Sequence, residues 1–227
     1  MCGRFIQISH PEVIRLGIPD LLIDPAVQES FVPRYNIAPT QNILTVLNTE
    51  RPTLTYTRWG LIPSWARDPS MGARMINARG ETLKEKISFK GPFRKRRCII
   101  FADGFYEWKS EGRIRVPYLI RMKDARPFGM AGLWDRWKDI RTGGEIITST
   151  IVTTSPNELA AAIHNRMPAI LKTEDYPVWL DPGTPRDETL MQCIAPFPQE
   201  MMEAYEVSRL VNNPSYDSPE CILARTA

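Results

Sequence analysis

The sequence contains no apolar run that approaches the roughly 18 residues a membrane-spanning helix needs, and its N-terminus has no signal-peptide pattern. We therefore expect no contact with a membrane and a location in the cytoplasm, with association to the nucleoid if the cell is bacterial. The chain also lacks internal repeats, low-complexity linkers and abrupt changes of composition. Residues 1–227 are therefore predicted to form a single domain.

Histidine is scarce, and cysteine is never clustered. The only histidines are His10 and His164, and no two cysteines form a Cys-x-x-Cys pair. The four cysteines are Cys2, Cys98, Cys193 and Cys221. Zinc sites and disulfide frameworks need closely spaced ligands or paired cysteines, so this pattern favours buried thiols in a reducing compartment. We expect neither a metal ion nor a cofactor.

The residues that are present indicate a globular protein. Hydrophobic residues make up 43% of the 227 positions and charged residues 24%, which is typical of a folded domain. The 20 prolines favour loops and short strands over long helices. A net charge of +3 permits an anionic partner without requiring one. We predict an α+β fold, a compact β-rich domain with packed or barrel-like antiparallel sheets and peripheral helices.

Local patterns predict the elements of this fold. The predicted strands cover residues 42–47, 54–59, 118–121, 129–134 and 146–153, and another strand begins near residue 201. The predicted helices cover residues 82–86, 156–163 and 173–180. Ser155 and Glu158 form a capping box at the start of the second helix. Asp103-Gly104 is typical of a turn between two strands.

Cys2 becomes the N-terminal residue if the initiator Met1 is removed. Its α-amine, with a pKa of roughly 7.7–8.0 against roughly 10.4 for lysine, would then be partly unprotonated at neutral pH. An amine and a thiol on neighbouring carbons condense with an aldehyde to an imine, which the tethered thiol closes to a five-membered thiazolidine. The alternative is that Cys2 is only the residue that follows Met1.

Two side chains are candidates for proton transfer. His164 lies at the end of the predicted helix 156–163, where the helix dipole favours the imidazolium by roughly 0.3–1 kcal/mol. It could donate protons near neutral pH, or only cap helix carbonyl groups. Glu107 lies among aromatic residues. If Glu107 points inward, desolvation should raise its pKa toward a useful range, although an outward orientation is the more common one.

Other polar residues also allow two interpretations. Asn77 and Arg79 share one face if their segment is extended, but asparagine also suits a turn and arginine a surface ion pair. The basic run 94–97 is either a solvated approach to a strand or a patch that contacts phosphates.

Six motifs occur in order along the chain. They are Met1-Cys2-Gly3-Arg4-Phe5, Tyr35-Asn36-Ile37-Ala38-Pro39, Trp59-Gly60-Leu61-Ile62-Pro63, Ile76-Asn77-Ala78-Arg79, Phe101-Ala102-Asp103-Gly104-Phe105-Tyr106-Glu107-Trp108 and Ile163-His164-Asn165-Arg166-Met167-Pro168. This set resembles the SOS response-associated peptidase (SRAP) family, and the similarity extends to Asn212. The ordered combination is specific, whereas any one motif alone is weak.

The resemblance implies a protein that senses abasic sites in single-stranded DNA and attaches to the ring-opened sugar through a thiazolidine. Cys2 would be the nucleophile after Met1 is removed, and Asn77 would hold the sugar and the Cys2 backbone. Glu107 would hydrogen-bond the amine and move protons, and His164 would assist ring opening and imine formation. Such a protein is a single-turnover crosslinking enzyme with lyase-like chemistry, or falls into a peptidase or hydrolase class.

The resemblance also implies a DNA-binding surface. Its residues would be Arg4, Asn36, Pro39, Trp65, Arg79 and Arg166. The three arginines would contact phosphates, and the proline and tryptophan would lie against bases. The family pattern can carry a second aromatic residue after this tryptophan, and Ala66 here implies a weaker or differently shaped wedge. We expect a monomer whose partners are abasic single-stranded DNA and replication-fork proteins.

Two other functions stay open at this point. Cys2 and His164 could form the nucleophile and base of a cysteine peptidase, whose minimal reaction would be cleavage of the bond between Met1 and Cys2. The chain could instead be a non-covalent module that binds single strands through tryptophan and arginine. Only lesion capture requires an aldehyde and leaves a covalent adduct.

Overall fold

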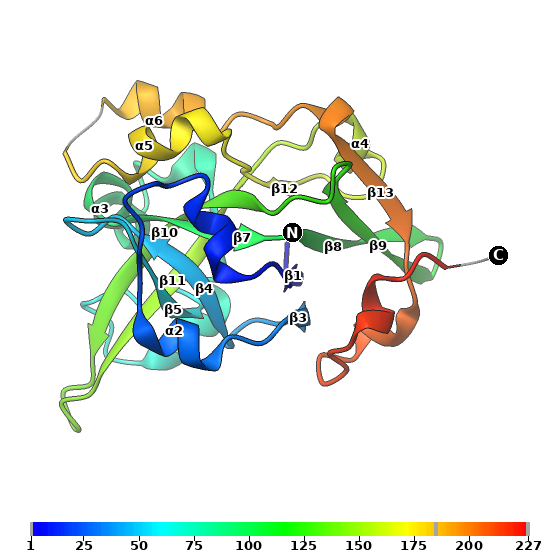
Figure 1. Cartoon of the computed structure of the whole chain (residues 1–227). Coiled ribbons are helices and arrows are strands. Elements are labelled where there is room, and N and C mark those ends of the chain that lie inside the picture. Colours follow the sequence, from blue (N-terminus) through cyan, green and yellow to red (C-terminus); the bar gives the residue numbers. More distant parts are fainter. Residues whose placement is uncertain (1, 184–185, 226–227) are drawn as a thin grey trace.

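A closed barrel of five strands forms the centre of the computed structural model, which describes residues 2–183 and 186–225 (Figure 1). The barrel strands are β4 (Asn42–Leu47), β5 (Thr53–Trp59), β7 (Arg97–Ala102), β10 (Phe128–Lys138) and β11 (Glu145–Thr154). Neighbouring strands are antiparallel, except that β11 pairs in parallel with β5 and closes the ring. Closure removes the unpaired edges that an open sheet would expose.

A second sheet of five strands packs beside the barrel, in the order β13-β9-β8-β1-β3. Its strands are β1 (Phe5–Gln7), β3 (Arg34–Ile37), β8 (Gly104–Glu111), β9 (Ile114–Met122) and β13 (Met202–Glu206). Three short strands extend the barrel, namely β2 (Leu22–Ile23), β6 (Asn77–Arg79) and β12 (Met167–Pro168). The predicted β-rich α+β fold with barrel-like sheets is confirmed.

The helices are short and lie outside the sheets. They are α1 (Pro11–Arg15), α2 (Pro25–Ser30), α3 (Ile87–Lys95), α4 (Glu158–Ala161), α5 (Tyr176–Leu180) and α6 (Asp187–Cys193). Proline occupies one of the first two positions of α1, α2 and α5, where its missing N–H costs no helical hydrogen bond. Within the described residues, no helix is long and apolar enough to cross a membrane.

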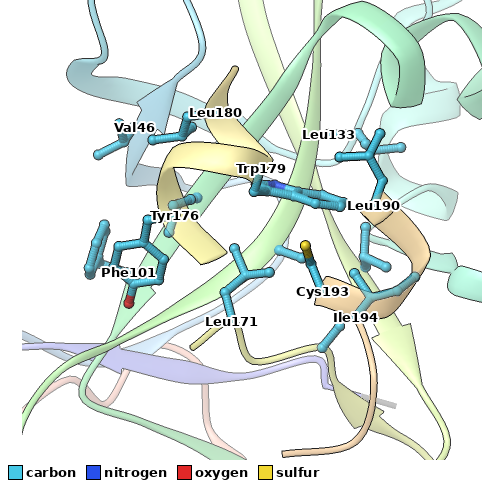
Figure 2. Close-up of a cluster of buried hydrophobic side chains, with 14 of the residues drawn as sticks. Val46, Phe101, Leu133, Leu171, Tyr176, Trp179, Leu180, Leu190, Cys193 and Ile194 are labelled. Carbon is cyan, nitrogen blue, oxygen red and sulfur yellow. The ribbon is translucent and has the colours of Figure 1, made fainter. Parts of the chain in front are cut away.

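One hydrophobic cluster joins the barrel to α5 and α6. Figure 2 shows the Trp179 indole of α5 close to Leu133 of β10 and to Leu190 and Cys193 of α6. The Trp179 side chain is fully buried, and its Nε1 donates to the Cys98 carbonyl at 2.9 Å. A buried tryptophan needs such a partner for its one polar atom, so this bond fixes how α5 lies on the barrel.

A second cluster fills the space between the barrel and the second sheet. Phe5 of β1 meets Trp59 of β5 edge to face, with ring centroids 5.0 Å apart. Cys2 and Phe105 belong to the same cluster. Cys2 and the start of β1 are therefore held in the junction of the two sheets.

Asp103-Gly104 lies between two strands, as predicted, but these strands do not pair as a hairpin. β7 and β8 flank it, but β7 belongs to the barrel and β8 to the second sheet, so the chain crosses from one sheet to the other here. The Asp103 carboxylate accepts hydrogen bonds from the Ile8 amide at 2.6 Å and from the Ser9 amide at 3.1 Å. The dipeptide therefore ties the crossover to the segment after β1.

The predicted helices 82–86 and 156–163 differ from the helices that the structure has in these regions. Residues 80–82 form a 3-10 turn, and the regular helix α3 starts later, at Ile87. The predicted helix 156–163 shrinks to α4, because Asn157 and not Ser155 caps it, accepting from the Ala160 amide at 2.9 Å.

The basic run 94–97 does not form one exposed patch. Arg94 and Lys95 end α3, whereas Arg97 begins β7 and is fully buried. The Arg97 guanidinium donates to four backbone carbonyls, those of Phe93, Arg94, Trp179 and Asp181. Burial lowers the pKa of Arg97. This arginine therefore joins α3 and α5 to the barrel, and it cannot reach a phosphate.

Replacing Arg97 by alanine should lower the free energy of unfolding by about 3 kcal/mol or more, because buried carbonyl groups lose their donor. Urea unfolding would measure the change. Arg94→Ala is the matched control, since the exposed Arg94 side chain should matter by no more than about 0.5 kcal/mol. Equal effects of the two substitutions would contradict the structural role of Arg97.

Candidate active site at the junction of the two sheets

Cys2 is completely buried, and Asn77 holds its backbone. The Asn77 Nδ2 donates to the Cys2 carbonyl at 2.8 Å, and the Cys2 Sγ lies 3.9 Å from the Arg4 carbonyl. Burial raises the pKa of the Cys2 thiol far above its ordinary value, and the neighbouring charge of Glu107 raises it further. The resting thiol is therefore neutral and a weak nucleophile.

The barrel determines where Asn77 lies. β6 pairs in parallel with β11, with Asn77 opposite Ile151, and the Trp59 Nε1 donates to the carbonyl of the preceding Ile76 at 2.9 Å. The buried Asn77 Oδ1 has no hydrogen-bond partner among the described residues. Since the Nδ2 is already engaged by Cys2, this oxygen is an acceptor available to a bound hydroxyl or amine.

Glu107 points inward. It lies on β8 and is only 3% exposed, on the same face of the strand as Phe105, which packs in the Cys2 cluster. Desolvation raises the Glu107 pKa, although the imidazole of His164 opposes this shift electrostatically. A raised pKa makes a carboxyl group a better proton acceptor when it is ionised and lets it keep a proton to donate at a higher pH than an exposed glutamate.

His164 follows α4 and continues its last turn, with its amide donating to the Ala160 carbonyl at 2.8 Å. The His164 Nδ1 accepts from the Arg166 amide at 3.1 Å. A ring nitrogen that accepts a hydrogen bond carries no proton, so the neutral ring keeps its proton on Nε2. His164 therefore presents a defined tautomer, and its electrostatic effect on Glu107 places the two groups in one site.

Arg4 borders this site and is firmly held. Its NH1 donates to the Asn36 Oδ1 at 2.7 Å and to the Val211 carbonyl at 2.8 Å. The guanidinium also lies over the Trp108 ring, 5.9 Å from its centroid. The fixed position of the arginine suits an anion-binding role, because little side-chain freedom remains to be lost.

Asn36 was expected on the DNA-binding surface, but it is fully buried. Its Nδ2 lies within 3.2 Å of three carbonyls of the C-terminal segment, at Val211, Asn213 and Tyr216. Since its Oδ1 accepts from Arg4, Asn36 connects that arginine to the segment and offers no surface to DNA.

Sequence reasoning missed Asp217, which completes this connection. Its carboxylate accepts from the Tyr35 amide at 2.5 Å, from the Asn36 amide at 3.0 Å and from the Arg34 side chain. Asp217 therefore fixes β3, an edge strand, to the C-terminal segment. The one advance signal was a lone aspartate in a proline- and serine-rich tail, which gives no indication of its partner 181 residues earlier.

Arg79 and Arg166 differ in whether their guanidinium groups can contact a DNA phosphate. Arg166 forms a two-pronged ion pair with Glu81, at 2.5 and 3.0 Å, and its NH2 also donates to the Thr153 carbonyl at 2.6 Å. This pairing lowers the Glu81 pKa and keeps Glu81 ionised. Arg79 is exposed at the end of β6, two residues beyond Asn77. Arg79 is thus the better placed of the two to contact a phosphate.

Pro39 and Trp65 lie outside the buried cluster of side chains. Pro39 is partly buried in the turn after β3, next to Thr40, whose φ is 72°. Trp65 is 54% exposed, whereas Ala66 is buried and its carbonyl accepts from the Trp137 Nε1 at 2.7 Å. The tryptophan ring therefore faces solvent, on a loop that the hydrogen bond from Trp137 ties to β10.

The structure thus brings Cys2, Asn77, Glu107 and His164 together, with Arg4 at their border. No group of three histidine, cysteine, aspartate or glutamate side chains could hold a metal ion in the part of the chain that is described. The site can supply a nucleophile, a shared proton and an oriented amide, all in a desolvated setting.

Comparison with known proteins identifies the family of this chain. The model of the family "SOS response associated peptidase (SRAP)" matches residues 1–214, and the chain belongs to this family. The abasic site processing protein YoqW of Bacillus subtilis is 45% identical over 225 residues, covering 98% of this chain and 99% of YoqW.

A more distant relative and a solved structure are also similar to this chain. The abasic site processing protein HMCES of Gallus gallus is 36% identical over 189 residues, covering 73% of this chain and 56% of that protein. An X-ray structure of a protein from Bacteroides thetaiotaomicron has a TM-score of 0.85 and 30% identity, and the match covers 98% of this chain and 100% of that one.

Replacing Glu107 by glutamine should make the fold more stable at neutral pH. A raised carboxyl pKa means that the folded state prefers the protonated form, so the contribution of Glu107 to stability is fully present below the unfolded pKa of about 4.3. That contribution is lost as pH rises through the folded pKa, while glutamine keeps it. Urea unfolding at a series of pH values would test this, and a difference between variant and wild type that does not change with pH would refute it.

Proposed function

We propose that this chain captures abasic sites in single-stranded DNA as a covalent thiazolidine adduct of Cys2, once Met1 has been removed. The observation that carries the proposal is the buried Cys2 thiol beside the buried Glu107 carboxyl group, in a site whose Asn77 holds the Cys2 backbone. The names of the relatives support the lesion as substrate, since YoqW and HMCES are both described as abasic site processing proteins.

The first step opens the sugar. An abasic deoxyribose is a cyclic hemiacetal, and opening it requires a proton on the ring oxygen and removal of one from the anomeric hydroxyl. Glu107 suits this exchange because burial raises its pKa, so that the carboxyl group holds a proton to a higher pH than an exposed glutamate does. The Nε2–H of His164 supplies a second donor, and the free Asn77 Oδ1 can accept from a sugar hydroxyl.

The second step joins amine and aldehyde. The unprotonated α-amine of Cys2 adds to the aldehyde carbon, and loss of one water gives an imine. The Cys2 sulfur then adds to the imine carbon while the thiol proton passes to the nitrogen, which closes the thiazolidine without any other reactant. Since the imine is consumed, the β-elimination that would cut the strand is suppressed.

Because the thiol is buried, the amine of Cys2 reacts before its sulfur does. Burial raises the pKa of the Cys2 thiol, so the thiol does not compete with the amine for the aldehyde. A protonated imine beside the sulfur would lower the thiol pKa, because a nearby positive charge favours the thiolate. The sulfur therefore becomes reactive only after the imine has formed.

A cysteine-peptidase function fits the site less well. Such enzymes need a thiolate, which a cationic neighbour stabilises, whereas burial and Glu107 both disfavour the Cys2 thiolate. The Nδ1 of His164 is already occupied by the Arg166 amide, which leaves only its protonated Nε2.

Cys2→Ala should abolish the stable adduct while keeping some strand cleavage. The variant retains an N-terminal α-amine after Met1 is removed, and that amine can still form an imine that eliminates. Incubation with an abasic single strand, followed by a denaturing gel, separates the two products. An adduct of undiminished heat stability from Cys2→Ala would show that the thiol is not required.

Arg79→Ala should weaken binding equally for all DNA sequences and reduce the slope of log K against log salt by about one. The reason is that the exposed Arg79 lies at the end of β6, next to the site, and a phosphate contact carries no sequence information. Arg113→Ala is the matched control, because Arg113 is equally exposed but belongs to the turn between β8 and β9. A loss confined to particular base sequences would argue for base contacts at Arg79.

A further inference from the structure

The ion pair between Arg166 and Glu81 joins two segments that each carry part of the site. Arg166 lies two residues after His164, on the segment that leads from α4 into β12, and Glu81 lies in the 3-10 turn that follows β6. The Arg166 side chain is 15% exposed and that of Glu81 is 53% exposed. Because half-exposed ion pairs contribute little to stability, the effect of this pair on the geometry of the site matters more than its energy.

The Arg166 guanidinium is held in one orientation. Its NH1 and NH2 each donate to one oxygen of the Glu81 carboxylate, and NH2 also donates to the carbonyl and the Oγ1 of Thr153, at 2.6 and 3.2 Å. A planar guanidinium that forms a two-pronged pair on one side and contacts a strand on the other cannot rotate without breaking several bonds. Glu81 and β11 therefore fix the side chain of Arg166, and with it the backbone of that residue.

The backbone of Arg166 contacts the imidazole of His164. The Arg166 amide donates to the His164 Nδ1 at 3.1 Å, while the His164 amide donates to the Ala160 carbonyl at 2.8 Å. On the other side of Arg166, Met167 pairs with Thr154 of β11. The bond to Nδ1 leaves the proton of the neutral imidazole on Nε2. The orientation of the Arg166 amide therefore determines the tautomer that His164 presents to the site.

Glu81 is placed by the strand that also places Asn77. β6 pairs in parallel with β11, and the 3-10 turn that contains Glu81 follows β6 directly. A Cβ atom on Gly80 would lie 3.3 Å from the Thr153 carbonyl, so a residue without a side chain lets the turn lie close against β11. Since Asn77 holds the Cys2 backbone, Glu81 connects the strand that holds Cys2 to the segment that carries His164.

We propose that Glu81 is a positioning residue: through the guanidinium of Arg166 it holds the Arg166 amide against the His164 Nδ1, and so keeps the imidazole proton on Nε2 for use in ring opening. This inference rests on the proposed function, in which His164 assists that step. It gives Arg166 an effect on the rate of ring opening that is separate from any contact with a phosphate.

The tautomer matters because the ring oxygen of the sugar gains negative charge as its bond to the anomeric carbon breaks. The Glu107 carboxylate takes the proton of the anomeric hydroxyl and returns it to the ring oxygen, so the step consumes no other reactant. The Nε2–H of His164 donates a hydrogen bond to that oxygen while the charge develops, which lowers the barrier. With its proton on Nδ1, the imidazole would present an acceptor to the ring oxygen and could not assist.

Long-range ¹H–¹⁵N NMR spectra of the mature protein, in mildly alkaline buffer that keeps imidazole neutral, report the tautomer directly. Since the chain has only two histidines, a His10→Gln variant assigns the signals. Wild type should carry the His164 proton on Nε2, and Glu81→Ala should give a mixture of tautomers. Glu85→Ala is the matched control, because Glu85 is an exposed glutamate four residues further on that forms no ion pair within the described residues, and it should leave the tautomer unchanged.

A kinetic readout separates ring opening from binding. Two single strands are compared, one with an abasic site and one with an aldehyde that has no hydroxyl group to close a ring. Glu81→Ala should slow capture of the abasic site by about tenfold or more and capture of the ring-free aldehyde by less than about twofold. Arg166→Lys should do the same, because lysine keeps the charge but cannot bind both Glu81 oxygens.

Binding is measured with a strand that carries tetrahydrofuran in place of the sugar and therefore cannot react. Glu81→Ala should bind this strand no more weakly than wild type, since the substitution removes a negative charge. Equal slowing on both aldehydes, an unchanged His164 tautomer in Glu81→Ala and Arg166→Lys, or a wild-type proton on Nδ1 would overturn the positioning role alone. A wild type that forms no adduct would instead overturn the proposed function.

Discussion

The parallel pairing of β11 with β5 and β6 is the constraint on which the rest of the structure depends. The pairing with β5 closes the barrel, and the pairing with β6 places Asn77 where it can hold the Cys2 carbonyl. The segment that follows Met1 packs between the closed barrel and the second sheet, and Cys2 is buried there. Cys2 is thus held in place by strands that are far from it in the sequence.

Burial then determines the chemistry of the site. In water, the Cys2 thiol and the Glu107 carboxyl would both ionise near their ordinary pKa values. Between the two sheets, desolvation raises both pKa values, so the thiol stays protonated at neutral pH and the carboxyl group holds its proton to a higher pH than it would in water. This arrangement disfavours the thiolate that a cysteine peptidase needs. It suits the proposed reaction, in which the amine adds to the aldehyde before the sulfur reacts.

The local elements could be predicted from the sequence, whereas their long-range connections could not. The strand 42–47 was predicted with its observed bounds, because a run of apolar residues between turn residues is a local signal. The Asp103-Gly104 pair is equally local, yet here it lies at a crossover between sheets, which only the barrel closure explains. Asn36 and Asp217 were misjudged or missed because their role depends on a contact across 181 residues. The grouping of Cys2, Asn77, Glu107 and His164 was predicted through the family resemblance, not through spacing.

The most direct test of the account is tandem mass spectrometry of the adduct, after nuclease and trypsin digestion. Trypsin should release the peptide Cys2-Gly3-Arg4. The account predicts that this peptide carries the sugar remnant with the loss of one water, that its thiol resists alkylation, and that borohydride adds no hydrogen. A sugar remnant on a lysine, or a Cys2 peptide with an alkylatable thiol, would contradict capture through a thiazolidine.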